Sequence, residues 1–198
     1  MNDSLLSGIE LGPVEKVGFT NPDGTAVEGF VIKPADFNPG QKYPLILWIH
    51  GGPIGQYSYS LHTTGQLFAA NGYVVLLVNP RGSTGYGEDF TKANFGHDQY
   101  IKWYNAEFGL PWENKELWEK LSPFNDIEKI TSPTLWIGGA VDWNVPIVNS
   151  EQMYLGMKTL GRETQLVVYP NEHHGIRRPS FQKDRFERFL GWYDKYLK

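Results

Sequence analysis

Four short apolar runs stand out in the pattern of hydrophobic and polar positions along the chain. They lie at Tyr43–His50, Tyr73–Val78, Thr134–Gly138 and Thr164–Tyr169. Each run has the length of a strand, and the segment from Leu45 to Ile49 contains no polar residue. Such unbroken runs are typical of strands that are buried on both faces of a parallel sheet. We therefore expect these segments to form a mostly parallel sheet.

Longer segments with apolar residues at helical spacing lie between and after these strands. They are Leu61–Asn71, Ser122–Ile130, Val148–Leu160 and the amphipathic Phe181–Leu197. Gly72 and Gly161 follow two of them, at the position where many helices end in a left-handed conformation. A strand, a helix and a second strand in this order predict the β-α-β unit of a parallel sheet.

The first part of the chain has a different pattern. Apolar and polar residues alternate on both sides of the turn sequence Asn21–Gly24, which predicts a β-hairpin over Val14–Lys33. A chain of 198 residues is expected to form one domain, residues 1–198. The expected fold class is α/β, with a mostly parallel sheet, an N-terminal β-hairpin and flanking helices.

The composition narrows the classes of function. The net charge is −4, and no basic run appears, so nucleic acid is not an expected partner. The absence of cysteine excludes a disulfide framework, a thiolate nucleophile and a cysteine-based metal site. No secretory signal is visible, and no apolar stretch approaches the ~18 residues that span a bilayer. We therefore expect a cytoplasmic protein with no membrane partner and no cofactor.

A tight glycine turn follows the first apolar run. It consists of His50, Gly51, Gly52 and Pro53. Two glycines let the backbone turn sharply and bring its N–H groups close to a ligand. A turn of this kind builds one half of the oxyanion hole in serine hydrolases.

A carboxylate and an imidazole follow the last two apolar runs. Asp142 lies four residues beyond Gly138, and His174 lies beyond the next run. Functional groups of open α/β sheets gather beyond the carboxyl ends of the strands, so the two residues fit the acid and the base of a Ser-His-Asp triad. A turn aspartate is the alternative for Asp142. His173 competes for the base, but Gly175 lets the loop turn the His174 ring inward. No metal site is expected, because no third ligand has suitable spacing.

Five motifs together resemble the catalytic domain of the prolyl oligopeptidase family of serine peptidases, especially its acylaminoacyl-peptidase-like branch. They are HGGP at His50–Pro53, NPRGSTGYG at Asn79–Gly87, LSP at Leu121–Pro123, GGAVDWNVP at Gly138–Pro146 and YPNEHHGI at Tyr169–Ile176. Their order, and every interval but one, is similar to the family's. The resemblance covers most of the chain and implies an α/β-hydrolase fold.

The resemblance also implies roles for single residues. It makes Asp142 the triad acid and His174 the triad base. It makes Gly52 a backbone donor of the oxyanion hole, with His50 bracing the turn. Arg81 would be structural and would hold the end of its strand beside the site.

The sequence departs from the family at the nucleophile. The family's serine lies in a G-x-S-x-G elbow, and this sequence contains no G-x-S-x-G. Ser83 comes nearest, but Arg81 occupies the first glycine position. Asn79 and Leu121 are only 42 positions apart, whereas a strand, the elbow and helices separate these motifs in the family. We therefore identify no nucleophile and expect an internal deletion near Tyr100, which leaves a truncated α/β-hydrolase fold.

Three hypotheses about function follow. The first is a serine-type peptidase that acts on peptides or acyl-peptides and is impaired because its serine is missing. The alternative is a non-catalytic relict that acts as a binding module, with self-association through faces bared by the deletion. The third gives the reaction to a substitute nucleophile, Ser58, Ser60 or Ser83, although turn serines are common. No propeller domain is expected, because the chain starts where the hydrolase domain would begin.

Overall fold

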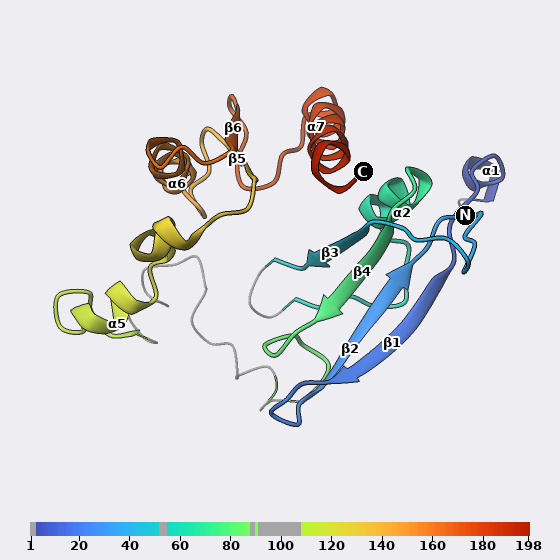
Figure 1. The fold of residues 1–198 in the computed structure, drawn as a ribbon, viewed down its shortest axis with the longest axis horizontal. Coiled ribbons are helices and arrows are strands. Elements are labelled where there is room, and N and C mark those ends of the chain that lie inside the picture. Colours follow the sequence, from blue (N-terminus) through green and yellow to red (C-terminus); the bar gives the residue numbers. More distant parts are fainter. Residues whose placement is uncertain (1–2, 52–54, 88–89, 91–107) are drawn as a thin grey trace. The chain divides into compact units, whose positions relative to one another are not determined.

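The computed structural model describes residues 3–51, 55–87, 90 and 108–198. The chain divides into two compact units, Met1–His97 and Asp98–Lys198 (Figure 1). The deletion expected near Tyr100 falls outside the described residues.

A four-stranded mixed sheet is the frame of the first unit. After the short helix α1 (Asp3–Leu6), its strands are β1 (Val14–Thr20), β2 (Ala26–Ile32), β3 (Leu45–Ile49) and β4 (Val74–Asn79), in the order β1-β2-β4-β3 (Figure 1). The hairpin of β1 and β2 is confirmed, and β2 pairs antiparallel with β4. The apolar strands β3 and β4 pair in parallel, as expected, with Leu47 opposite Leu76.

Helix α2 (Thr63–Ala70) packs against β2 and β4 of this sheet. Phe68 of α2 is fully buried, and its ring lies 5.6 Å from that of Trp48 and 6.3 Å from that of Tyr73. The helix ends as predicted, because Gly72 follows it with φ of 83°. These aromatic side chains form much of the core on this side of the sheet.

Strand β3 differs from the prediction on one face. Ile46 is 2% exposed, whereas Leu45, Leu47 and Ile49 are 54%, 53% and 60% exposed. Burial of both faces is therefore a wrong prediction for this strand. Side chains alternate along a strand, and α2 contacts the face of Trp48. Within the first unit, none of the described helices covers the opposite face.

The second unit is built on a pair of parallel strands. Its elements are α5 (Lys115–Lys120), the 3-10 helix η1 (Pro123–Lys129), β5 (Thr134–Gly139), α6 (Ile147–Thr159), β6 (Thr164–Tyr169) and α7 (Pro179–Leu197). Gly139 of β5 lies opposite Tyr169 of β6. Helix α6 packs against both strands and buries Met157 completely. Both strands and all three predicted helices of this region are confirmed within one or two residues.

The C-terminal helix α7 is fixed to the end of β6 by polar and aromatic contacts. The Tyr169 hydroxyl donates to Oδ2 of Asp184 (2.8 Å), which also accepts from Nε of Arg188 (2.7 Å). Burial and the Asp184 carboxylate raise the pKa of Tyr169 to about 12. The Tyr169 ring lies 5.1 Å from that of Phe181. None of the described helices is both long and apolar enough to cross a lipid bilayer.

Candidate active site

The loop after β5 places Asp142 just beyond the carboxyl end of the strand. The Asp142 N–H donates to the carbonyl of Gly139 (3.3 Å). Its Oδ1 atom accepts the N–H groups of Asn144 (2.9 Å) and Val145 (2.8 Å). These bonds close a tight turn of the kind that aspartate favours. They occupy one carboxylate oxygen and leave Oδ2 for another partner.

Backbone hydrogen bonds hold the loop after β6 against this turn. The N–H of Ala140 donates to the carbonyl of Tyr169 (2.9 Å), and the N–H of Val141 donates to that of Glu172 (3.0 Å). Between these two carbonyls, Asn171 adopts φ of 59°, a left-handed conformation that asparagine tolerates better than most residues. The loop after β6 therefore turns sharply and follows the loop after β5.

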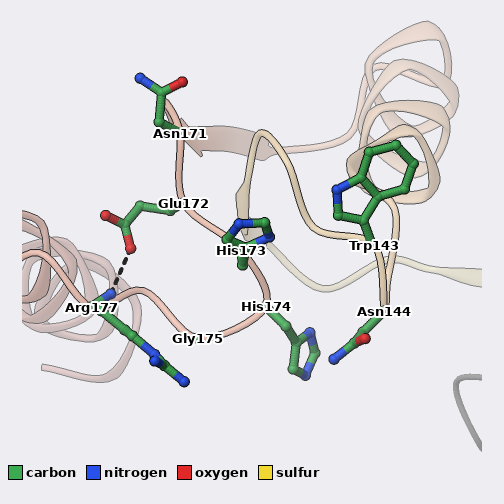
Figure 2. A pocket seen from close by; sticks show the side chains of 8 residues that line it. All are labelled: Trp143, Asn144, Asn171, Glu172, His173, His174, Gly175 and Arg177. Atoms are coloured by element: carbon green, nitrogen blue, oxygen red, sulfur yellow. Dashed lines mark hydrogen bonds between the residues drawn. The ribbon is translucent and has the colours of Figure 1, made fainter.

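Glu172 closes the loop that carries the histidines. Its side chain is buried, and its Oε2 accepts the N–H of Arg177 at 2.6 Å, as Figure 2 shows. Sequence reasoning did not single this residue out. Its only sequence signal is its place directly before the histidine pair in Tyr169–Ile176. A buried carboxylate that accepts a backbone N–H fixes the path of a loop more firmly than packing alone.

The structure brings Asp142 and His174 together. Nδ1 of His174 lies 2.9 Å from Oδ2 of Asp142, and the two side chains are 48% and 7% exposed. An ionised carboxylate can only accept a hydrogen bond, so Nδ1 carries the proton and Nε2 keeps its lone pair. This is the arrangement of a general base with its orienting acid. It distinguishes His174 from the adjacent His173.

Hydrogen bonding keeps the Asp142 carboxylate charged. Burial is the largest single influence and raises the pKa of Asp142. The hydrogen bonds from the Val145 N–H, His174 and the Asn144 N–H together outweigh it and lower the pKa below the usual 3.8. The carboxylate is therefore ionised at neutral pH and can stabilise a positive charge on His174.

A pocket of about 630 Å³ opens beside this pair (Figure 2). Its lining residues are Trp143, Asn144, Asn171, Glu172, His173, His174, Gly175 and Arg177. The Trp143 side chain is the most exposed large apolar group in the described part of the chain, at 82%. The pocket therefore combines an imidazole, polar groups and an aromatic face.

In the first unit, His50 contacts Ser83. Its Nε2 lies 2.8 Å from Oγ of Ser83, and the Ser83 hydroxyl donates to the carbonyl of Pro80 (2.7 Å). His50, which was predicted to brace the glycine turn, therefore contacts Ser83 in the loop after β4. Ser83 is fully buried, and its proton points to a carbonyl, so it does not have the geometry of an activated nucleophile. Gly52 lies outside the described residues, and Gly51 is exposed.

Asn79 and Arg81 follow β4 and make different contacts. Asn79 is fully buried, donates to the carbonyl of Tyr57 (2.9 Å) and to the hydroxyl of Tyr86 (2.8 Å), and accepts the Tyr57 N–H (2.7 Å). Arg81 is exposed and contacts Asp23 in the hairpin turn (2.8 Å). Sequence reasoning gave a structural role to Arg81 and to the Asn79–Gly87 loop, but it did not single out Asn79, whose signal is a polar residue at the end of an apolar run. Asn79 ties two loops of this unit together.

Comparison with known proteins shows which proteins this chain is similar to. The model of the prolyl oligopeptidase family, Peptidase_S9, matches residues 58–97 and 94–198. An uncharacterized peptidase of Bacillus subtilis, YuxL, is 26% identical over 270 residues, which cover 99% of this chain and 41% of that protein. Dipeptidyl-peptidase 5 of Schizosaccharomyces pombe is 23% identical over 275 residues, 100% of this chain and 40% of its own length.

Solved structures show the same fold. Pyrococcus horikoshii acylaminoacyl peptidase matches with a TM-score of 0.87 and 24% identity, over 100% of this chain and 44% of its own. The chain thus spans about two fifths of the length of the proteins that it matches. The likeness in structure supports the α/β-hydrolase fold, and the family match extends over most of the sequence. This chain belongs to the prolyl oligopeptidase family.

Proposed function

We propose that this chain carries the acid and the base of a serine-type peptidase that acts on peptides or acyl-peptides. Asp142 is the acid and His174 is the base. The observation that carries the proposal is the 2.9 Å contact between Nδ1 of His174 and Oδ2 of Asp142. The matched relatives are named as peptidases, which supports peptides as the class of substrate.

The geometry fits proton transfer by His174. With Nδ1–H held by Asp142, the Nε2 lone pair can take the proton of an attacking hydroxyl and later give it to the leaving group. The ionised Asp142 stabilises the imidazolium that forms between these two steps. The turn at His50, Gly51 and Gly52 would supply backbone N–H groups to the oxyanion.

Hydrolysis by this chain is impaired in our proposal, because the sequence contains no G-x-S-x-G. Two further observations support a missing segment. The relatives align over 270 and 275 residues, whereas this chain has 198. The family model matches in two separate stretches, residues 58–97 and 94–198, which overlap at residues 94–97. A triad without its nucleophile retains only the small acceleration that binding and the oxyanion hole provide.

Labelling with a fluorophosphonate probe tests this proposal, with an active serine hydrolase as positive control. We expect no stoichiometric labelling of the 198-residue chain. Stoichiometric labelling that is lost in His174→Ala would show that another serine serves as nucleophile, and mass spectrometry would locate it. Labelling that survives both His174→Ala and Asp142→Ala would remove the acid and base roles.

A non-catalytic binding module is the second candidate function. Its supporting observation is Trp143, which stands 82% exposed beside the pocket of His174. Exposed tryptophans are common centres of binding energy at interfaces. Calorimetric titration with N-acetylated peptides tests it. We expect Trp143→Ala to lose the heat of binding and Trp112→Ala, which removes a similarly exposed tryptophan outside this pocket, to keep it.

A further inference from the structure

Glu172 contacts both of the loops that carry the candidate acid and base. Its main-chain carbonyl accepts the N–H of Val141 (3.0 Å), which directly precedes Asp142. Its side-chain Oε2 accepts the N–H of Arg177 (2.6 Å), on the far side of His174 (Figure 2). Glu172 itself precedes His174 by two positions and is 7% exposed. A single buried residue thus connects the two halves of the pair.

The two ends of the histidine loop are fixed by different means. At the near end, the Glu172 N–H donates to the carbonyl of Tyr169 (3.4 Å), and Asn171 has its left-handed conformation. At the far end, Ile176 is buried in a core cluster that also contains Tyr169. The Ile176 carbonyl accepts from Nε2 of Gln182 in α7 (3.1 Å). Both ends of the loop are therefore anchored in the second unit.

Among the described residues, little packing holds the tip of this loop, residues 173–175. All three are exposed, and a Cβ atom built on Gly175 would have one neighbour within 4 Å, Nε of Arg177 at 3.9 Å. The path of the tip therefore depends on the bonds at its base. The hydrogen bond between the Glu172 side chain and the Arg177 N–H closes that base, because it joins the near end to the far end.

We propose that Glu172 is a positioning residue whose carboxyl oxygen holds His174 against Asp142. The proposal rests on the proposed function, because it takes these two residues as base and acid. The Glu172 side chain reaches the Arg177 N–H and not the imidazole, so it acts on His174 through the loop. The property that it supplies is an acceptor at the end of a side chain of this length, because its donor is a backbone N–H.

Two substitutions of Glu172 separate its acceptor from its volume. Glu172→Gln keeps an oxygen at the same distance along the side chain, so it should keep the contact. Glu172→Leu keeps much of the volume but has no acceptor, so it should leave the Arg177 N–H without this partner. The matched control is Met157→Ala, which removes a fully buried side chain from α6 of the same unit and changes no residue of the loop.

The tautomer of the neutral His174 ring is the spectroscopic readout, measured by long-range ¹H–¹⁵N spectra. The bond to Asp142 keeps the proton on Nδ1, and a ring that leaves Asp142 is free to carry it on Nε2. We expect the Nδ1–H population to fall by about twofold or more in Glu172→Leu. It should not change in Glu172→Gln or in Met157→Ala.

Hydrogen exchange of the unsubstituted chain gives a result that does not depend on how a variant folds. The Arg177 N–H is bound to a buried carboxyl oxygen, whereas Gly175 lies at the exposed tip. After correction for intrinsic rates, we expect the Arg177 amide to exchange about tenfold or more slowly than the Gly175 amide. Equal exchange of the two amides would overturn the proposal, because the base of the loop would then be open.

Three results with the variants would also overturn the proposal. They are an unchanged tautomer in Glu172→Leu, an equal loss in Glu172→Gln, and an equal loss in Met157→Ala, which would reflect general destabilisation. These results are distinct from a failure of the proposed function. Labelling by fluorophosphonate that survives His174→Ala would remove the base role, whereas an unchanged tautomer in Glu172→Leu would remove only the positioning role.

Discussion

The two carboxylate oxygens of Asp142 have different hydrogen-bond partners. Oδ1 accepts the N–H groups of Asn144 and Val145, and Oδ2 faces Nδ1 of His174. The backbone donors therefore fix the orientation of the carboxylate before any ligand arrives. Preorganisation of this kind is what an orienting acid requires.

Replacing Asp142 with asparagine should change the tautomer of His174. The two backbone N–H groups require an oxygen at the Oδ1 position, so the amide nitrogen would face Nδ1 of the imidazole. We expect the neutral ring to carry its proton on Nε2 in Asp142→Asn and on Nδ1 in the unsubstituted chain. Long-range ¹H–¹⁵N spectra measure this directly. The same tautomer in both chains would contradict the orienting role, and Asp126→Asn, on the surface, serves as control.

Sequence reasoning located this pair and chose His174 over His173, because Gly175 lets the loop turn the His174 ring inward. Asp142 and His174 were predicted because residues beyond consecutive strand ends gather at one edge of a sheet. The sequence did not predict the left-handed conformation of Asn171 or the hydrogen bond from Arg177 to Glu172, which shape the loop that carries His174. A residue pattern does not reveal these backbone details.

At the scale of elements, the contact between the end of β5 and the loop after β6 depends on Gly139. A Cβ atom at this position would lie 2.1 Å from the carbonyl oxygen of Glu172 and 2.4 Å from that of His173. Both obstacles are backbone atoms, which cannot move aside as a flexible side chain can. The two loops can approach each other only because this residue is glycine.

Gly139→Ala should therefore destabilise the second unit and separate Asp142 from His174. We expect a loss of about 1–3 kcal/mol in the free energy of unfolding, the usual cost of overpacking. Urea denaturation measures it, and the His174 Nδ1 proton signal reports the lost contact. Gly191→Ala in α7 is the matched control. Nothing lies within 4 Å of its Cβ position, so it should gain about 0.5–1 kcal/mol. Equal effects of the two changes would refute the argument.

The start of helix α2 should depend on pH. Nδ1 of His62 accepts the N–H of Gly65 at 2.9 Å, and burial lowers the pKa of His62 below 6.5. Only a neutral Nδ1 can accept. This stabilisation is therefore fully present above pH 6.5 and is lost as the pH falls through the lower folded-state pKa. His62→Asn keeps a capping acceptor that does not titrate. The stability of the unsubstituted chain should fall relative to His62→Asn on acidification, as measured by urea denaturation; parallel curves would contradict this.

The elements themselves followed from local patterns, but the exposure of β3 did not. Alternation, helical spacing and the glycines at 72 and 161 act over a few residues, so the hairpin, the helices and the strands were predictable. Whether a second element covers Leu45, Leu47 and Ile49 depends on segments far away in the sequence. An apolar run shows that a strand can be buried on both faces, and it does not show that the covering helix exists.

At the scale of the whole molecule, the exposure of Leu45, Leu47 and Ile49 has an energetic consequence. Full burial of a leucine or isoleucine side chain contributes about 1.5–3 kcal/mol. Leu45, Leu47 and Ile49 are more than half exposed, so together they gain roughly half of what full burial would provide, on the order of 2–4 kcal/mol. This is a large share of a typical domain stability of about 5–15 kcal/mol. Any element that covers these three side chains would therefore add substantially to the free energy of unfolding.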